Sequence, residues 1–177
     1  MPVKVYRLYK KCKLTCKLPY VPKPETTREE GKVHAEKVIK IIIDALRLRP
    51  KWFWRWLTNW AKIYVADEWY HLVTGEDVFE ITNICREKLY PKDWVKEVFD
   101  CDDFTNVLLG EVSLLRYKAR RNLAVGKIWF CSWKHGFCHA TTFYINGNEQ
   151  FVWYEPQLCR EAPMYNRYCD KVLLVVI

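Results

Sequence analysis

The sequence contains no apolar run long enough to cross a bilayer. Its longest apolar stretches, residues 39–43 and 172–177, are far shorter than the ~20 residues that a membrane-spanning helix needs. The first six residues, Met-Pro-Val-Lys-Val-Tyr, lack the apolar segment of a secretory signal peptide. No internal repeat or low-complexity segment is present. These absences predict a protein without a transmembrane segment, located in the cytoplasm or associated with a virion.

Glutamine is also scarce, whereas Lys, Arg, Glu, Ile and Val are plentiful, a composition that favours a thermophilic source. The chain has 177 residues, half of them apolar, which predicts one domain with a small appendage. Its formal charge is +8. Such a charge suits acidic partners such as nucleic acid or anionic lipid, but the basic residues are scattered, so a solvated surface explains them as well.

Eight cysteines are many for a protein made in a cytoplasm. Buried thiols, disulfides and metal ligands are the competing interpretations. Cys12 with Cys16, and Cys159 with Cys169, are spaced for a bridge across a turn. A zinc site is the least favoured, because Cys12 and Cys16 have no tidy second pair. Zinc binding by His135 together with Cys138 and His139 requires a turn at residues 134–137, since residues 135 and 139 of an extended strand are about 13 Å apart.

Hydrophobic periodicity predicts helices first and strands second, which is the α+β class. After a short strand and a loop over residues 1–24, the expected helices begin at Thr26 or Thr27, at Pro50, after the capping box of Thr74, and after Asp100. The expected antiparallel strands cover residues 123–133, 138–145, 150–155 and 172–177. In the second helix, Trp52 and Trp54 fall off the apolar stripe beside Lys51, Arg55 and Lys62, which favours contact with a partner.

The most informative feature is a cysteine followed by a histidine and a glutamate. Cys101 follows Asp100, and an N-cap at Asp100 puts the thiol in the first turn of a helix, where free N–H groups and the helix dipole favour a thiolate. A thiol, an imidazole and a carboxylate are the three parts of an activated cysteine nucleophile. Cys101, His139 and Glu155 are therefore the candidate catalytic residues.

The sequence around Gly147 brings His139 and Glu155 together. Each lies eight residues from Gly147, and a three-residue hairpin loop centred there sets them directly opposite on one face of a sheet. Opposed Cβ atoms are about 5 Å apart, close enough for the carboxylate to orient the imidazole. A two-residue turn at Asn146 and Gly147 would place them on opposite faces instead.

Three aspartates crowd the candidate nucleophile. Asp100, Asp102 and Asp103 are negatively charged, and carboxylates disfavour a nearby thiolate. Either they serve the N-terminus of the helix, or a cation neutralises them. Clustered oxygen ligands suit calcium, so these aspartates are the candidate metal ligands.

The sequences Asp-Cys-Asp-Asp-Phe at 100–104, His-Ala at 139–140 and Glu-Pro-Gln at 155–157, with spacings of 38 and 16 residues between the three candidates, resemble a known family. They are similar to the papain-like C-terminal domain of a mushroom galactose-binding agglutinin, and to uncharacterised phage and prophage proteins. The resemblance covers residues 70–177. Residues 1–69 form an N-terminal extension without a counterpart, and the agglutinin's sugar-binding part is absent.

The resemblance implies a papain-like fold and a calcium-dependent cysteine peptidase. It implies that Cys101 is the nucleophile, His139 the general base and Glu155 the orienting acid. By the same resemblance, Trp94 lines the substrate cleft and Gln157 helps to bind an oxyanion.

The sequence therefore predicts a papain-like cysteine hydrolase that cleaves peptide or amide bonds of a peptide or protein substrate through a thioester. Two other functions remain open. The fold could serve as a catalytically silent structural or interaction module that binds viral structural proteins. The charge and the aromatic residues also fit a basic nucleic-acid-binding protein.

Overall fold

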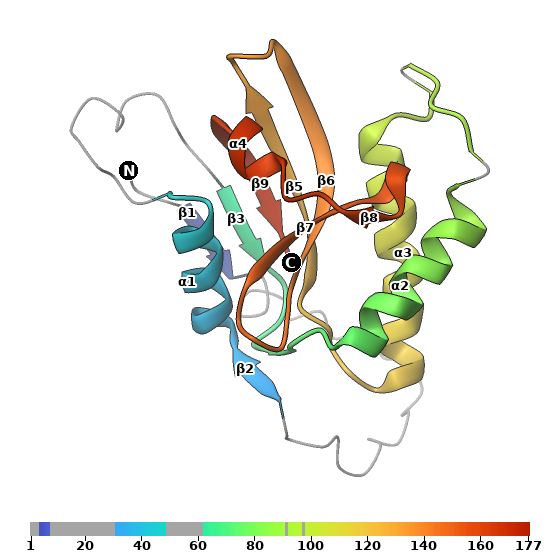
Figure 1. The fold of residues 1–177 in the computed structure, drawn as a ribbon. Helices are drawn as coiled ribbons and strands as arrows, with labels where there is room; N and C mark the ends of the chain where they lie inside the picture. Colours follow the sequence, from blue (N-terminus) through green and yellow to red (C-terminus); the bar gives the residue numbers. More distant parts are fainter. Residues whose placement is uncertain (1–3, 8–30, 49–61, 91, 97) are drawn as a thin grey trace, which may run out of the picture.

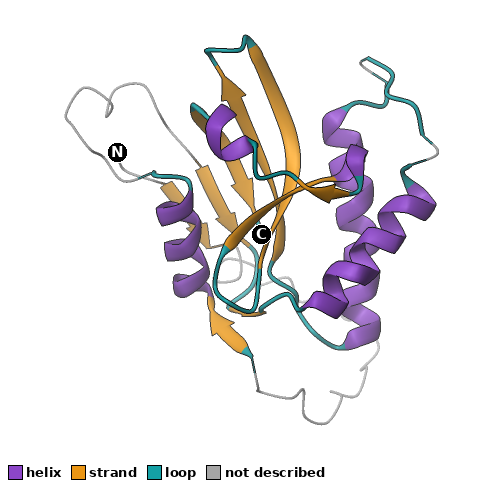
Figure 2. Ribbon diagram, in the orientation of Figure 1, coloured by secondary structure: helices purple, strands orange, loops and turns teal. Residues whose placement is uncertain are grey.

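The computed structural model describes residues 4–7, 31–48, 62–90, 92–96 and 98–177 (Figure 1). These residues form a seven-stranded sheet, a two-stranded sheet and helices on either side of the larger sheet (Figure 2). The large sheet has the order β1-β3-β9-β5-β6-β7-β8. Its strands are β1 (Lys4–Arg7), β3 (Lys62–Val65), β5 (Val125–Ser132), β6 (Phe137–Ile145), β7 (Phe151–Glu155), β8 (Arg160–Glu161) and β9 (Lys171–Val176).

The small sheet pairs β2 (Lys32–His34) with β4 (Trp69–His71) in antiparallel register. The α-helices are α1 (Ala35–Ala45), α2 (Gly75–Lys88), α3 (Cys101–Ala119) and α4 (Tyr165–Tyr168), and the 3-10 helix η3 is Pro156–Leu158. Among the described residues, no helix is both long and apolar enough to span a membrane. The α+β class is confirmed at this level.

Two hydrophobic clusters pack on opposite faces of the large sheet. Successive residues of a strand point to opposite faces, so Phe143 joins the cluster beneath α1 whereas Tyr144 joins the cluster beneath α2 and α3. Trp153 and Tyr154 of β7 divide in the same way. The sheet is therefore buried on both sides, and α3 packs on the face that carries Tyr144 and Tyr154. Figure 1 shows α1 and α3 on opposite sides of the sheet.

Local capping explains where α2 and α3 begin. The Thr74 side chain accepts from the backbone of Asp77, whose carboxylate accepts from Thr74 N at 2.8 Å. Asp100 and Asp103 make the same reciprocal arrangement at the start of α3. Both predicted helix starts are confirmed, because a capping box satisfies backbone N–H groups that the first turn leaves unpaired.

Of the two helices expected before residue 70, the first is confirmed over residues 35–45 but starts later than expected, and the second is wrong where it can be compared. The first helix begins at Ala35, capped by His34, because the preceding residues form β2. Most of the second predicted helix, residues 50–61, lies outside the described residues. This part includes Lys51, Trp52, Trp54 and Arg55. Its last part is strand β3, in which Ile63 and Val65 are buried between β1 and β9. Alternating burial in a sheet outweighs a short helical pattern.

The predicted C-terminal strands are confirmed, but the sheet is mixed and not antiparallel throughout. β5, β6, β7 and β8 pair antiparallel, whereas β1 pairs with β3 and β3 with β9 in parallel. Strands that precede residue 70 thus complete the sheet. The predicted boundary between residues 69 and 70 falls within β4, and the division into 1–69 and 70–177 stays a prediction.

Within the described part of the chain, a disulfide lies where the sequence did not indicate one. Cys131 and Cys138 are directly opposed on β5 and β6 and are bonded across the turn of that hairpin. Cys159 and Cys169 are free thiols in different hydrophobic clusters, so the predicted bridge between them is wrong. Zinc binding through Cys138 is likewise excluded, because its sulfur is bonded to Cys131. Cys12 and Cys16 lie outside the described residues.

Gly126 of β5 lies where neighbouring strands approach closely, so a substitution at this position tests the packing between the strands. A Cβ at this position would lie 2.3 Å from Val176 O and 2.7 Å from the Phe143 ring. We expect Gly126→Ala to lower the free energy of unfolding by about 1–3 kcal/mol through overpacking. Gly110→Ala is the control, because Gly110 lies inside α3 with nothing within 4 Å of its added Cβ. It should raise stability by about 0.5–1 kcal/mol. Urea unfolding measures both, and a neutral Gly126→Ala would contradict the close approach.

Candidate active site

Cys101 is the first residue of α3 and lies beside strand β6. Asp100 caps the helix, with its carboxylate accepting from Asp102 N at 3.4 Å. The backbone N–H of Ala140 donates to the Cys101 sulfur over 3.4 Å. The thiol therefore faces a helix N-terminus and one backbone donor, both of which favour a negative charge on sulfur.

His139 and Glu155 are brought together, but by a different register from the one expected. Glu155 follows Tyr154, which pairs with Thr142, so Glu155 is level with Thr141 and diagonal to His139. The loop spans residues 146–150 and is held by Asn146, whose side chain accepts from Asn148 N and Gln150 N. Because the loop has five residues where three were predicted, the pairing of the two strands shifts by two positions in total. An even shift keeps both side chains on the same face of the sheet. His139 Nε2 lies 2.7 Å from Glu155 Oε2.

Glu155 is a buried carboxylate with four hydrogen-bonding partners. It is 2 % exposed, and burying an unpaired carboxylate is costly. Its Oε2 contacts His139 and accepts from the Tyr165 hydroxyl at 2.5 Å and from Thr141 Oγ1 at 3.3 Å. Its Oε1 accepts from Gln157 N at 3.0 Å. Burial alone would raise the pKa of Glu155, but these donors, His139 foremost, hold it below its usual value.

The pKa of His139 is shifted in the opposite direction to that of Glu155. Burial alone would lower its pKa, but hydrogen bonding and charge interactions with Cys101 and Glu155 raise it from 6.5 to about 9. The imidazole is therefore protonated at neutral pH. Cys101 acts on this pKa through a side-chain hydrogen bond with the imidazole, so the thiol lies beside the ring. A thiol, an imidazole and a carboxylate, the three groups of an activated cysteine nucleophile, thus lie together.

Tyr165 is the member of this group that sequence reasoning missed. Its hydroxyl lies 3.2 Å from His139 Nε2 as well as 2.5 Å from Glu155 Oε2. Its ring packs against those of Phe130 and Trp153. Burial and the neighbouring Glu155 raise the pKa of its phenol well above the ordinary value, so it stays a donor. No motif marked it, because α4 reaches the site only through tertiary packing.

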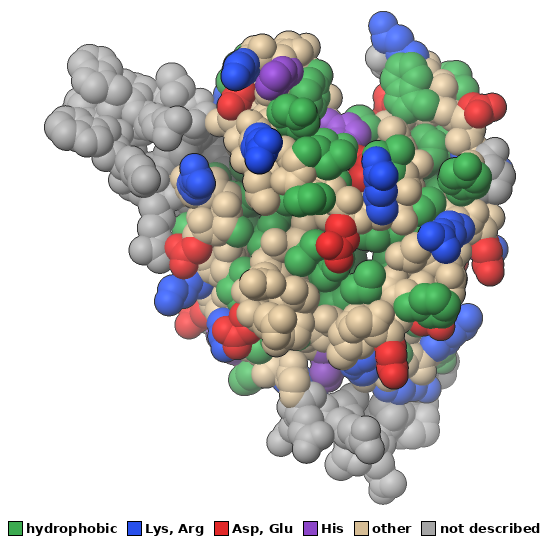
Figure 3. Space-filling model, in the orientation of Figure 1, with side chains coloured by type: hydrophobic (Ala, Val, Ile, Leu, Met, Phe, Trp, Pro, Cys, Tyr) green, Lys and Arg blue, Asp and Glu red, His purple; other side chains and the backbone are tan. Residues whose placement is uncertain are grey.

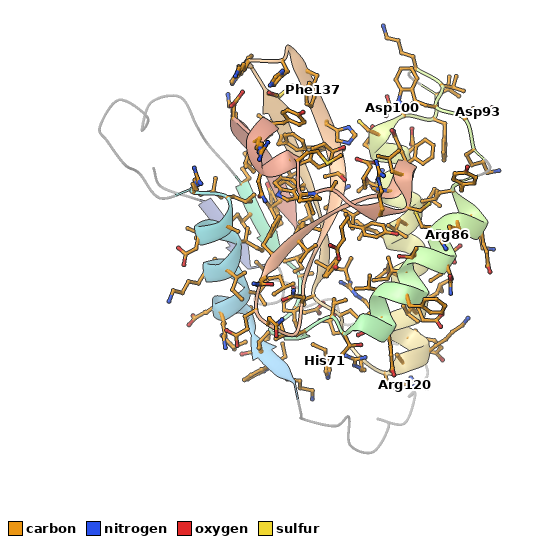
Figure 4. All side chains as sticks on the ribbon, viewed as in Figure 1. His71, Arg86, Asp93, Asp100, Arg120 and Phe137 are labelled. Atoms are coloured by element: carbon orange, nitrogen blue, oxygen red, sulfur yellow. A yellow bond between two sulfur atoms is a disulfide. The ribbon has the colours of Figure 1, made fainter. Side chains whose placement is uncertain are left out.

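The group lies beside a notch between two parts of the molecule. Figure 3 shows this hollow at the top, between the lobe built on the β5–β6 hairpin and the lobe that carries the start of α3, with hydrophobic side chains on both sides. Figure 4 places Phe137 on the hairpin side and Asp100 on the helix side. Trp94 is 55 % exposed in the segment that leads to α3. Its role in substrate binding, like the oxyanion role of Gln157, stays a prediction.

The aspartates divide between capping and a potential cation site. Asp103 accepts from Asp100 N in the capping box. Among the described residues, the one group with metal-ligand geometry is Asp100, Cys101 and Asp102, whose ligand atoms lie within 4.8 Å of one another. Hydrogen bonding to Asp100 raises the pKa of Asp102. Two carboxylates thus converge, but calcium takes six to eight oxygen ligands and a thiol is a soft one, so these side chains fit calcium only in part.

The raised pKa of His139 predicts a pH dependence of stability. Because the folded-state pKa is about 9 and the ordinary value 6.5, the stabilisation is complete below pH 6.5 and is lost as the pH rises through 9. We expect the free energy of unfolding to fall by about 3 kcal/mol over this range. The measurement is urea unfolding at a series of pH values, with His139→Gln as the reference. Equal slopes for both proteins would contradict the buried ion pair.

Tyr165→Phe removes one donor from a buried carboxylate. We expect it to lower the free energy of unfolding at pH 7 by about 1–3 kcal/mol. The loss should shrink at acid pH, where Glu155 becomes protonated and needs fewer donors. Tyr168→Phe is the matched control on the same helix, because the ring contacts of Tyr168 with His135 and Phe137 survive the change. If both variants behave alike at pH 7, the Tyr165 hydroxyl does not support Glu155.

Comparison with known proteins identifies the fold but no family. No family model matches the chain, and no curated protein matches it. Among solved structures, one described as a complex of PSL1a with E64 is 19% identical over 83% of this chain, with a TM-score of 0.60. Another, Polyporus squamosus lectin bound to the epitope Neu5Aca2-6Galb1-4GlcNAc, is 20% identical over 83% of the chain, with a TM-score of 0.63.

These matches bear on the expected family in two ways. The likeness to a mushroom lectin is confirmed at the level of the fold. The prediction that this chain is a cysteine peptidase, thiol protease or hydrolase is contradicted by these neighbours, because one is named as a lectin and neither is named as a peptidase. The chain spans about half the length of the lectin chains that it matches. At this identity, it shares their fold.

Proposed function

We propose that this protein is a cysteine-dependent acyl-transfer enzyme that cleaves an amide bond, with Cys101 as the nucleophile. The observation that carries the proposal is the buried pair of His139 and Glu155, 2.7 Å apart, beside a thiol at the start of α3. A carboxylate saturated with donors keeps the imidazole oriented and protonated, and a protonated imidazole stabilises a thiolate.

In the proposed reaction, the Cys101 thiolate attacks the carbonyl carbon of the amide and a carbon–sulfur bond forms. His139 then gives its proton to the leaving nitrogen as the carbon–nitrogen bond breaks, which leaves a thioester. A water molecule, or an amine in a transamidation, attacks the thioester and returns a proton to His139. The carbon–sulfur bond breaks and the thiolate is restored. Glu155 stays ionised throughout and holds the ring.

The geometry supports a papain-like arrangement as part of this proposal. A nucleophile at a helix N-terminus and a histidine on a neighbouring strand are common to such sites, and here they lie on α3 and β6. Ala140 N–H and the first turn of α3 are the donors nearest the sulfur, and we propose that an oxyanion would form beside them. A peptide or protein is the proposed source of the amide, with Trp94 as part of the binding surface.

The sugar named for the second lectin structure is not carried over to this chain, because half-length coverage at 20% identity concerns the fold alone. Two alternatives from the sequence remain as proposals. One is a catalytically silent module that binds viral structural proteins. The other is a nucleic-acid-binding protein, to which the charge of +8 would contribute.

Thiol labelling separates the enzyme from these alternatives. E64, an epoxide that alkylates thiolates, is a suitable probe, since one of the solved neighbours is a complex with it. We expect labelling of Cys101 at pH 7, because the protonated His139 stabilises its thiolate. Cys169 is the internal control, since burial raises the pKa of its thiol to about 12. Mass spectrometry of the digested protein locates the label.

Variants make the labelling test decisive. His139→Gln should slow labelling of Cys101 at least about tenfold, because the imidazole that activates the thiol is lost. Cys169→Ser should leave the rate unchanged. If Cys101 and Cys169 react equally slowly in the wild-type protein, the proposed activation is absent and a silent module is the better account.

We also propose that a calcium ion, if bound, would be held by Asp100 and Asp102, where it would relieve the repulsion between their carboxylates. Calcium should then raise the midpoint of thermal unfolding, and a chelator should reverse the rise. Asp102→Asn should abolish the effect. Asp93→Asn is the control, because Asp93 lies in the neighbouring loop outside this group. An equal calcium response in all three proteins would show that the ion binds elsewhere.

A further inference from the structure

A second candidate site lies at the opposite end of α3 from Cys101. A cavity of about 560 Å³, broadly open to solvent, is formed by residues of β2, β4 and the loop before β4, the last turn of α3 and the segment that follows α3. Figure 4 shows the separation, with Asp100 at the top and Arg120 and His71 at the bottom. The 19 residues of α3 correspond to about 28 Å of helix. The two places are therefore chemically independent.

Arg116 is the central group of this cavity. One of its terminal nitrogens, Nη2, donates to Leu123 O at 2.5 Å and to Val125 O at 2.7 Å, which anchors the guanidinium to β5 and the residues before it. Its Nε is buried and has no hydrogen-bond partner within the described part of the chain. Leaving a buried charged donor unpaired is costly. Arg116 also lines the cavity and contributes its positive charge there.

Three other basic side chains line the same cavity, and the carboxylate of Asp67 attracts the charge of Arg116. Arg121 also lines the cavity, but it is engaged by Asp77, with Nη1 to Oδ1 at 2.9 Å, and by Leu72 O. Arg120 is exposed, and its guanidinium lies over the Tyr117 ring at 4.7 Å. Lys32 adds a fourth basic side chain from β2. Figure 3 shows Lys and Arg side chains gathered at this lower end of the molecule.

The negative end of the helix dipole does not rule out an anion here. Two of the last four carbonyl groups of α3, those of Arg116 and Tyr117, already accept from the backbone N–H groups of Arg120 and Arg121. The partial charges of these two groups are therefore offset within the chain.

The other residues that line the cavity indicate which class of anion it suits. Asp67 and Glu68 also line the cavity, and two carboxylates disfavour a dianionic phosphate but accept hydrogen bonds from hydroxyl groups. Trp69 lines the same cavity and is 52 % exposed, with one edge held against the His34 ring. An exposed indole beside donors and acceptors suits a ring that has an apolar face and polar edges.

We propose that this cavity binds an acidic saccharide, whose carboxylate pairs with Arg116 and Arg120 and whose sugar ring packs on Trp69. Asp67 and Glu68 accept from its hydroxyl groups. The inference goes beyond the proposed acyl transfer and does not depend on Cys101.

Calorimetric titration of the full chain tests it, with glucuronate as the probe, glucose as the uncharged control and inorganic phosphate as the control for charge alone. We expect glucuronate to bind with a dissociation constant in the millimolar range or below, and neither control to bind detectably. Trp69→Ala and Arg120→Gln should each weaken binding at least about tenfold, the usual effect of losing one good contact. Lys118→Gln is the matched control, since Lys118 lies on the same helix but does not line the cavity.

Arg116→Lys keeps the positive charge but removes the planar set of guanidinium donors, so it should also weaken binding of glucuronate. A circular dichroism spectrum shows whether this variant folds. Binding of glucuronate that survives both Trp69→Ala and Arg120→Gln would overturn the proposed site. Equal binding of phosphate would overturn the saccharide assignment, and equal binding of glucose would overturn the role of charge. Absence of glucuronate binding would overturn the inference as a whole, while leaving the labelling of Cys101 as a separate result.

Discussion

The buried carboxylate of Glu155 is the constraint on which the candidate active site depends. A carboxylate that is 2 % exposed is tolerated only where hydrogen bonds replace its lost hydration. Its partners come from three separate elements, with His139 and Thr141 on β6, Gln157 on η3 and Tyr165 on α4. Satisfying this one group therefore requires the C-terminal segment to fold back over β6 and β7. The same requirement orients the imidazole toward the start of α3.

The two-sided sheet supplies the second half of the site. Because β6 and β7 bury residues on both faces, α1 can pack on one face while α2 and α3 pack on the other. Phe104, Leu108 and Val112 anchor α3 to its face and leave its first residue next to β6. Core packing thus determines the position of a thiol that makes few core contacts itself. The same helix ends beside Arg116 and its cavity, so one rigid element positions both candidate sites.

Several features followed from local sequence because local physics determines them. The caps at Thr74 and Asp100 depend on hydrogen bonds within four residues, and both were predicted. The placement of His139 and Glu155 on one face follows from the two-residue period of strands, and it holds although the register is displaced. The displacement itself was missed, because Asn146 stabilises a wider loop than the turn sequence indicates.

What the sequence determined by itself was the set of elements with strong local signals: the starts of α2 and α3, the C-terminal strands, and the order of thiol, imidazole and carboxylate. Tertiary structure alone decided the rest. Residues 62–65 became a strand because β9 and β1 offered parallel partners, and Cys131 paired with Cys138 because strand register opposed them. Tyr165 reached Glu155, and Arg116 was buried beside Trp69, through contacts between distant segments. Such contacts depend on packing across the whole chain, which no short pattern encodes.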